Sequence, residues 1–415
     1  MMFVGIDWGN RKHAICMVDG EGKVVAQTMF DHDAGGLSGL LSWISDHAGD
    51  HDVKVGMETP RGPLVEALLD RELAVFAVNP KQLDRFRDRF GAAGAKDDRR
   101  DARVIADSLR TDERAFRAIA PSLPWVAELR ELSRMREDLV VERVALVNGI
   151  REQLGRYFPQ MLELVTDIDA AWVHALIQAA PTPAQAAVLR RAKLARLLVG
   201  VRRFTVDEAQ ALLKSPGFKV SKATTVSASR RTLSLMRRLG LIHDELHLCD
   251  QAIERLLAQQ TSSEQSETAE GDDAEGQQKE QRDVVVLQSL PGVGSTILAT
   301  LLGEAWELLR GRDYYALRAY AGVAPVTRQS GKQRSVVRRY ACNTRLANAV
   351  FNWARCVLSR DPVSKAKYST LRQRGHSHGR AIRAVADRLL SVACAMLRTG
   401  KEFDAGMREL LTPAA

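Results

Sequence analysis

The chain has 415 residues and a net charge of +9 at pH 7, with 60 Lys and Arg residues against 51 Asp and Glu residues. Its length predicts two or three domains, each with a core of its own. No apolar run approaches the roughly 20 residues that span a bilayer, and no signal peptide is recognised, so we expect a cytoplasmic protein without membrane segments. Five scattered cysteines without a Cys-x-x-Cys pair argue against a disulfide framework and a zinc site.

Short apolar runs alternate with turns over the first 80 residues. Strands are expected at residues 1–7, 13–18, 23–30, 53–57 and 74–78, with one helix after the third strand and another, residues 63–71, after the fourth. A three-strand meander followed by alternating helices and strands is the order of an α/β ribonuclease-H-like fold, a mixed sheet with helices on its faces. We predict this fold for residues 1–120.

Four acidic residues lie where this fold would bring them together. Asp7 ends the first strand, and Glu58 follows the fourth strand, which is the expected neighbour of the first. Asp98 and Asp101 are three residues apart at an expected helix start, so they share one face. Four carboxylates at one place repel each other unless cations neutralise them, and such oxygen ligands suit Mg²⁺ or Mn²⁺. The pattern favours a two-metal phosphodiester site over separate roles as turn former, helix cap and arginine partner.

Two apolar stripes predict long helices in the middle of the chain, residues 121–260. Spacings of three and four recur from Leu235 to Leu256, and a similar stripe follows the helix expected from Trp125 to Tyr157. We expect a coiled-coil pairing of these helices. The pairing is either a hairpin within one chain or one whose outer face joins protomers or holds nucleic acid. Short helices are expected between them, at residues 161–225.

An acidic tract, residues 261–281, precedes the last third of the chain. It holds seven acids and one lysine and lacks aromatic and β-branched aliphatic residues, which predicts a disordered linker. In the mainly α-helical C-terminal domain expected at residues 282–415, the run Leu290-Pro291-Gly292-Val293-Gly294 stands at a helix start. It is similar to the turn of a helix-hairpin-helix element, whose backbone amides approach a phosphate. An ordinary glycine-rich turn is the alternative.

Positive charge is concentrated in this C-terminal domain. From Tyr314 to Arg360 there is no acid, while nine Lys and Arg residues occur. A surface of one sign fits a phosphate backbone, so we expect DNA as a partner, and a solvated basic face without a partner is the alternative. Ser330 lies in an expected flexible basic loop, where its hydroxyl would be exposed. Taken alone, such a residue is more often a turn serine.

Together these motifs resemble the DEDD insertion-sequence transposases, which are bridge-RNA-guided recombinases with a RuvC-like N-terminal domain. The resemblance covers nearly the whole chain and keeps the order of the motifs, which are Gly5-Ile6-Asp7-Trp8, Met57-Glu58-Thr59-Pro60, Val78-Asn79-Pro80, Lys96 to Ala102, Leu290 to Gly294, Tyr320 to Pro325 and Ser330-Gly331. It implies that Asp7, Glu58, Asp98 and Asp101 are catalytic, metal-binding acids and that Ser330 is the catalytic serine. One departure is Asp97, where the family usually has threonine, so a further carboxylate stands beside Asp98.

The resemblance also implies a function. It is that of a DNA transposase that performs excision and integration by metal-assisted strand exchange, with Ser330 as the nucleophile that holds DNA covalently. The implied cofactor is Mg²⁺ or Mn²⁺. The implied partners are DNA, a structured guide (bridge) RNA and further copies of the chain, in a dimer or tetramer whose site is completed between protomers.

Two other classes of protein stay open at this point. A sugar-kinase or actin-like ATPase would use Gly5 to Gly9 as a phosphate loop, but no second phosphate loop is found. A non-catalytic nucleic-acid-binding protein would account for the positive charge, but it would leave the four acids unused. Tyr340 is the alternative nucleophile if Ser330 has no catalytic role.

Overall fold

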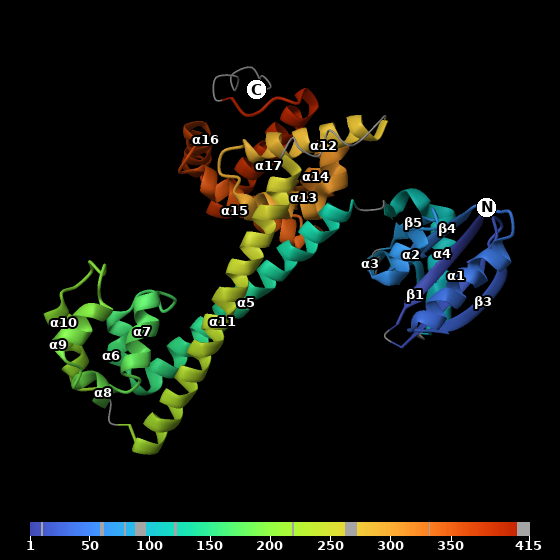
Figure 1. Cartoon of the computed structure of the whole chain (residues 1–415). Helices are drawn as coiled ribbons and strands as arrows, with labels where there is room; N and C mark the ends of the chain where they lie inside the picture. The colour runs from blue at the N-terminus through green and yellow to red at the C-terminus, as the bar shows by residue number, and fades with distance from the viewer. Residues whose placement is uncertain are drawn as a thin grey trace. The chain divides into compact units, whose positions relative to one another are not determined.

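The computed structural model describes residues 1–9, 11–58, 62–78, 80–87, 97–119, 123–217, 220–261, 272–331 and 333–404. The chain divides into two compact units, Met1–Leu123 and Pro124–Ala415 (Figure 1). The finer division of the second unit at residues 260 and 281 stays a prediction. Within the described ranges, no helix is long and apolar enough to cross a membrane.

The first unit contains a six-stranded mixed sheet with the strand order β3-β2-β1-β4-β5-β6. β1 pairs antiparallel with β2 and β2 with β3, which is the expected meander, whereas β1, β4 and β5 are parallel. A short sixth strand, which no sequence pattern predicts, pairs antiparallel with β5. The strands are β1 (Met2–Trp8), β2 (Lys12–Val18), β3 (Val24–Asp31), β4 (Val53–Met57), β5 (Ala74–Ala77) and β6 (Arg117–Ile119).

Helices cover both faces of this sheet, because successive side chains of a strand point to opposite sides. On one face, Val4 and Ile6 of β1 pack with α1 (Ala34–Ala48) and α2 (Pro63–Leu69). On the other face, Phe3 packs with α4 (Asp98–Asp112), which also contacts α3 (Pro80–Arg87). The 3₁₀ turn η2 (Glu113–Ala115) connects α4 to β6. The predicted ribonuclease-H-like order of elements is therefore present.

The close approach of α4 to the sheet depends on two glycines. A Cβ atom at Gly5 would lie 2.0 Å from the carbonyl oxygen of Ala102 and 2.5 Å from the amide nitrogen of Ala106. A Cβ atom at Gly56 would lie 2.8 Å from Cγ2 of Ile105. Any side chain at Gly5 would therefore push α4 outward, and these glycines determine how deeply the helix sits on the sheet.

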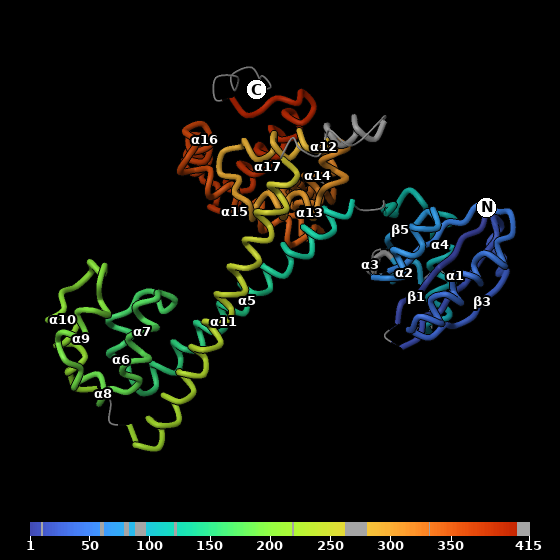
Figure 2. Tube along the Cα trace, viewed as in Figure 1, coloured from blue at the N-terminus to red at the C-terminus, as the bar shows by residue number. Residues whose placement is uncertain are grey.

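Two long helices, α5 (Pro124–Tyr157) and α11 (Lys222–Thr261), pack against each other in the second unit (Figure 2). They are antiparallel, because Cys249 Sγ donates to the carbonyl of Leu132 near one end, while Gly149 lies against Leu235 nearer the other. The predicted pairing within one chain is confirmed. Met135, an apolar residue of the stripe predicted between Trp125 and Tyr157, is 45% exposed.

A helical subdomain, residues 158–217, connects these two helices. It consists of α6 (Pro159–Leu164), α7 (Ala171–Ala179), α8 (Pro183–Ala187), α9 (Arg191–Leu197) and α10 (Val206–Lys214). Its apolar core is continuous with the last turns of α5 and the first half of α11. The short helices expected between residues 161 and 225 are therefore present.

The remaining elements of the second unit are mainly helical. They are α12 (Asp272–Gln288), α13 (Ser295–Arg310), α14 (Tyr314–Tyr320), β7 (Val326–Ser330), β8 (Gln333–Val337), α15 (Thr344–Val357), α16 (Pro362–Gln373) and α17 (His378–Thr399). The buried Trp353 of α15 donates its indole N–H to the carbonyl of Pro291, just before α13, at 2.9 Å. This bond joins α15 to the turn between α12 and α13.

The linker predicted over residues 261–281 is corrected at both ends. Thr261 still belongs to α11, and α12 already begins at Asp272, while residues 262–271 lie outside the described residues. The reason is that Val284, Val286 and Leu287 are buried and anchor the C-terminal half of α12. Once a helix is anchored, each further Gln or Glu adds a hydrogen bond at little cost, so the helix extends into the acidic tract.

Candidate functional site

The pairing of β1 with β4 makes Asp7 and Glu58 neighbours. Ile6 is paired with Met57 in parallel register, so the next residues along the two strands lie side by side at their carboxyl ends. Gly5 and Gly56, two residues earlier, both face α4, and the alternation of the strands directs Asp7 and Glu58 to the same face. Both acids are half-buried.

The first turn of α4 lies toward this same edge of the sheet, because the helix runs antiparallel to β1. At its other end, Arg110 donates to the carbonyl of Gly20 in the β2–β3 turn, at 3.4 Å. Glu113, just beyond the helix, accepts from Lys54 at the start of β4, at 2.6 Å. Asp101, one turn before the Ile105 that covers Gly56, is only 2% exposed. Three of the four predicted acids therefore share one face and one edge.

Asp101 is held by an arginine that the sequence motifs did not single out. Nε and Nη2 of Arg87, at the end of α3, donate to the two carboxylate oxygens of Asp101, each at 2.7 Å. These hydrogen bonds raise the pKa of Arg87 against the opposing effect of burial, and the charges of Asp101, Asp84 and Glu58 add to the rise. A positive charge is thus already bound within the electrostatic reach of two of the predicted acids.

Asp98 differs from Asp101 in its surroundings. It opens α4 and is exposed, whereas the preceding Asp97 is the N-cap, whose carboxylate accepts from the amide of Arg99. The helix-cap role that was the alternative for Asp98 therefore belongs to Asp97. A capping carboxylate is committed to the helix amides, so Asp98 is the better candidate ligand of the two.

In the described part of the chain, no group of three or more His, Cys, Asp or Glu side chains is arranged to hold a metal ion. The chemistry of Asp7, Glu58 and Asp101 nevertheless fits Mg²⁺ or Mn²⁺, which bind through carboxylate oxygens. The guanidinium of Arg87 also lies where a cation is favourable. Ligation by Asp101 would require this carboxylate to exchange Arg87 for the ion.

Ser330 lies at the tip of a β-hairpin rather than in the flexible loop predicted from the sequence. It ends β7 and pairs with Gln333 of β8, and the next residue, Gly331, has φ +55°. Such positive φ values are typical of tight hairpin turns. The hairpin forms because β-branched Val326 and Thr327 pair with Val337 and Val336. The serine itself is exposed, as predicted.

The base of this hairpin is held by backbone hydrogen bonds. The amides of Val323 and Ala324 donate to the carbonyl of Arg318 at 3.1 and 3.0 Å, and the amide of Asn343 donates to the carbonyl of Tyr320 at 2.8 Å. Arg318 in turn forms a bidentate ion pair with Asp387 of α17. The serine is thus presented on an exposed tip whose two ends are anchored to α14, and Arg318 joins α14 to α17.

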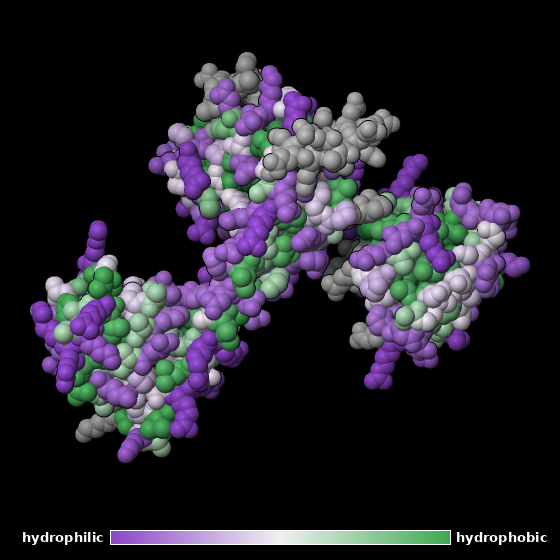
Figure 3. All heavy atoms as spheres, viewed as in Figure 1, coloured by the Kyte–Doolittle hydropathy of each residue, from purple (hydrophilic) through white to green (hydrophobic). Residues whose placement is uncertain are grey.

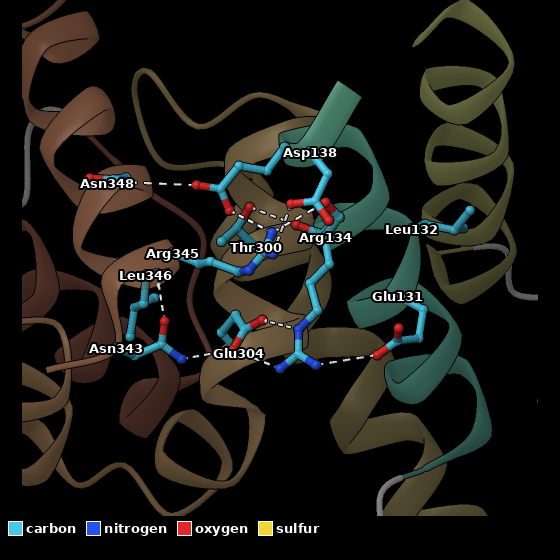
Figure 4. A network of polar contacts seen from close by, with 12 residues as sticks. Glu131, Leu132, Arg134, Asp138, Thr300, Glu304, Asn343, Arg345, Leu346 and Asn348 are labelled. Atoms are coloured by element: carbon cyan, nitrogen blue, oxygen red, sulfur yellow. Dashed lines mark hydrogen bonds and ion pairs between the residues drawn. The ribbon is translucent and has the colours of Figure 1, made fainter. Parts of the chain in front are cut away.

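A buried carboxylate joins the segment after the hairpin to two other helices (Figure 4). The side chain of Glu304 in α13 is only 4% exposed, and it accepts from Arg134 Nε of α5 and from Asn343 Nδ2, both at 2.7 Å. Burial acts to raise the pKa of Glu304, but the hydrogen bonds from Arg134 and Asn343, with the charges of Arg134 and Arg130, lower it. Glu304 is therefore ionised and fully engaged at neutral pH.

A second set of ion pairs lies beside it (Figure 4). Arg345 of α15 donates to Glu137 and Asp138 of α5 at 2.8 and 2.9 Å. These contacts were not predicted from the sequence, although one signal was present. Glu304 interrupts an apolar run, Ile297 to Trp306, and an acid buried in such a helix needs a cationic partner.

The two glycines before α13 have different surroundings. Gly292 has φ +81°, and a Cβ atom there would lie 3.2 Å from the amide nitrogen of Val357 in α15. A Cβ atom at Gly294 would meet nothing within 4 Å. Gly292 is therefore needed for packing, and phosphate contact at Gly294 stays a prediction.

A ribonuclease-H-like sheet with acids at its carboxyl edge, followed in the chain by a helical second unit with a basic hairpin, is the arrangement expected of a transposase of the DEDD type. Residues 4–159 match a transposase family model of this type, and residues 285–369 match the model described as "Transposase IS116/IS110/IS902 family".

Curated relatives agree with this class. The chain is 47% identical to the putative transposase y4uE of Sinorhizobium fredii over 49% of its own length, and the match spans only 58% of that relative. It is 32% identical to the mini-circle putative transposase for IS117 of Streptomyces coelicolor over 97% of this chain and 95% of that protein. It is 28% identical to an uncharacterized protein of insertion element IS116 of Streptomyces clavuligerus, over 97% of this chain and 96% of that protein.

The chain therefore belongs to the IS116/IS110/IS902 family of transposases. It is a DNA transposase, and the ATPase and the non-catalytic binding protein are no longer needed as alternatives. DEDD transposases generally depend on a divalent metal, and a transposase binds DNA.

Proposed function

We propose that this transposase excises and integrates an insertion sequence by strand exchange, with Ser330 as nucleophile and with Asp7, Glu58, Asp98 and Asp101 as ligands of Mg²⁺ or Mn²⁺. The observation that carries the proposal is the register of β1 and β4, which makes Asp7 and Glu58 neighbours on the face where α4 presents Asp101. Sequence motifs far apart in the chain thereby meet at one edge of the sheet.

The serine step is a transesterification. Ser330 Oγ bonds to the phosphorus while the bond to one sugar oxygen breaks, so the serine proton is lost and the departing oxygen gains a proton. The phosphodiester bond energy is kept in the protein–DNA ester, which a hydroxyl group of another strand can attack. Arg328 precedes Ser330 by two residues on the same strand, so it shares its face and is suited to bind the phosphate oxygens.

The acids act on the same phosphate in this proposal. A divalent ion held by Asp7, Glu58, Asp98 and Asp101 would supply positive charge for the phosphoryl oxygens and lower the pKa of a nearby hydroxyl group. Asp97 caps α4 and is not a ligand in this proposal. Arg87 neutralises Asp101 until the metal ion binds.

The acids and Ser330 belong to different compact units. Their joint action is therefore part of the proposal, as is a homo-oligomer, dimer or tetramer, in which the site is completed between protomers. A structured guide RNA that pairs with donor and target DNA is the remaining part, and it is supported by the family resemblance. The proposal also includes a coiled-coil pairing of α5 with α11. It further includes contact between the turn before α13 and a phosphate.

Trapping of the covalent intermediate tests the nucleophile. DNA carrying the end of the insertion sequence is incubated with the protein, and the products are separated under denaturing conditions. We expect a protein–DNA adduct with the wild type and with Ser335→Ala, an exposed serine of β8, but none with Ser330→Ala. An adduct that persists in Ser330→Ala overturns the assignment and directs attention to Tyr340, which is 81% exposed.

Complementation tests the shared site. Asp7→Asn and Ser330→Ala proteins are assayed separately and then mixed in equal amounts. Recovery of strand exchange in the mixture is expected if one subunit supplies the acids and another the serine. If the mixture stays inactive although both proteins bind DNA, completion between protomers is wrong.

A further inference from the structure

The helical subdomain carries a second surface of one charge sign. From Ala170 to Val206 the chain has no Asp or Glu. Within this stretch six cations are concentrated in 14 residues, and all six are exposed: Arg190, Arg191, Lys193, Arg196, Arg202 and Arg203. We call these six residues the subdomain basic surface. None of them belongs to the acid cluster or to the hairpin of Ser330.

Local structure keeps these cations on the outside. Leu194 and Leu198 bury the inner face of α9, so the charged residues of the helix occupy its remaining faces. Gly200, with φ +83°, then turns the chain, and Arg202 and Arg203 follow before α10 begins. α9 and α10 contact each other, and Figure 3 shows hydrophilic side chains, with hydrophobic ones between them, on the surface of the helical subdomain.

Acids compensate little of this charge. Among the described residues, Arg191 is the one member of the six with an ion-pair partner, Asp207, and both of these side chains are well exposed. An excess of positive charge facing solvent costs folding energy through self-repulsion and favours an anionic partner. The spacing of several cations on one edge fits a repeating phosphate backbone rather than a single small anion.

The aromatic residues of the helical subdomain distinguish between kinds of nucleic acid. Proteins that hold single strands stack the bases on exposed aromatic side chains. Here Phe158 is buried, and Trp172 and Phe204 pack edge to face with ring centroids 5.9 Å apart. No aromatic side chain of residues 158–217, all of which are described, is among the exposed large hydrophobic residues. The surface therefore suits the outside of a duplex.

We propose that the subdomain basic surface binds the phosphate backbone of double-stranded DNA that flanks the strand-exchange point. Ser133 of α5 contacts Thr300 in α13, whereas Tyr157 at the other end of α5 belongs to the core of the helical subdomain. At about 1.5 Å per residue, these two points of α5 are about 36 Å apart, which is about one turn of B-form DNA. The helical subdomain would therefore meet the duplex about one helical turn from DNA that lies at the α13 end of α5. This contact requires neither Ser330 nor the acids, so it goes beyond the proposed chemistry.

The test compares two variants of the full chain with equal net charge. One is Arg196→Gln/Arg202→Gln/Arg203→Gln, and the matched control is Arg151→Gln/Arg156→Gln/Arg255→Gln, three exposed arginines of α5 and α11. Both are made in Ser330→Ala protein, so that only binding is measured and a failure of the proposed chemistry has no effect on the result. The probe is a 40-base-pair duplex, a length of about four helical turns, that carries the end of the insertion sequence, titrated at several KCl concentrations.

The first variant is expected to weaken binding by at least about tenfold and to make the slope of log K against log[KCl] about 2 to 3 units less negative. Hydroxyl-radical protection of the duplex that flanks the exchange point should disappear in this variant and stay in the control. The lysine variant Arg196→Lys/Arg202→Lys/Arg203→Lys should retain both, which separates a charge effect from a folding defect. Equal slopes and footprints in the first variant and the control overturn the proposal. A loss confined to a structured RNA probe overturns the choice of duplex DNA.

Discussion

The acid cluster of the first unit and the Ser330 hairpin of the second unit are built in opposite ways. Asp101 is buried, and its position depends on a helix that touches the sheet backbone at Gly5. Ser330 is exposed on a two-stranded hairpin that is anchored only at its base. Metal ligands need fixed geometry, whereas a nucleophile that must enter a DNA backbone needs access. The comparison therefore predicts that damage to packing affects the acids and leaves the serine tip intact.

The largest expected effect is at the exposed site. Ser330→Ala should reduce strand exchange by on the order of 10³-fold or more, because the reacting oxygen is removed. The thermal unfolding midpoint should stay within about 1 °C of the wild type, since exposed substitutions change stability by less than about 0.5 kcal/mol. Rates are measured by product formation on gels, with Ser335→Ala as control. A clearly lower unfolding midpoint of Ser330→Ala would show that the hairpin tip contributes to the stability of the fold.

Removing one acid should have the next largest effect. Glu58→Gln is expected to reduce strand exchange by about 10² to 10³-fold while duplex DNA binding is retained, because charge stabilisation at the phosphate is lost. Asp46→Asn, an exposed acid of α1, serves as the control and should react at the wild-type rate. A Glu58→Gln protein with full activity over a Mg²⁺ titration would remove this residue from the site.

A packing variant separates the two regions directly. Gly5→Ala should destabilise the first unit by about 3 kcal/mol, because the new methyl group would overlap the backbone of α4. The control is Gly20→Ala, where a Cβ atom would meet nothing within 4 Å and stability should be unchanged. Hydrogen exchange measured by mass spectrometry should show faster exchange in β1 and α4 and none of this increase in β7 and β8. An equal increase in hydrogen exchange in β7 and β8 would contradict the predicted difference between the two regions.

The smallest effect is expected at Glu304, the buried carboxylate that joins the segment after the hairpin to α5. Glu304→Gln should destabilise the second unit by about 2 kcal/mol, since Arg134 loses its buried ionic partner. Glu307→Gln, an exposed acid one turn nearer the end of α13, is the control. Chemical denaturation of both variants and the wild type gives the difference.

The lowered pKa of Glu304 determines how its contribution to stability changes with pH. The folded-state pKa of Glu304 is lowered, so its contribution to stability is fully present above the unfolded value near 4.5. It is lost as pH falls through the lower folded value. The stability difference between wild type and Glu304→Gln should therefore shrink below about pH 4.5 and stay constant between pH 6 and 8. A difference that grows on acidification would contradict the assigned role.

Local patterns were sufficient for much of the first unit. Strand alternation and turn residues predicted the order of its first five strands, and with that order the neighbouring positions of Asp7 and Glu58. The limits of α5 were predicted to within a residue, because helical periodicity is repeated over many turns. Composition did not predict the start of α12 within the acidic tract, since the buried valines that anchor this helix lie beyond residue 281.

By itself, then, the sequence determined the order of the strands along the chain and the long helices, because these depend on contacts between near neighbours in the chain. Only the tertiary structure decided that Arg87 holds Asp101, that Asp97 rather than Asp98 caps α4, and that Ser330 stands on a hairpin. The same is true of Glu304, whose partner Arg134 is 170 residues away in the chain. Such pairs depend on burial and on the direction of side chains after packing, and neither is encoded in a local period.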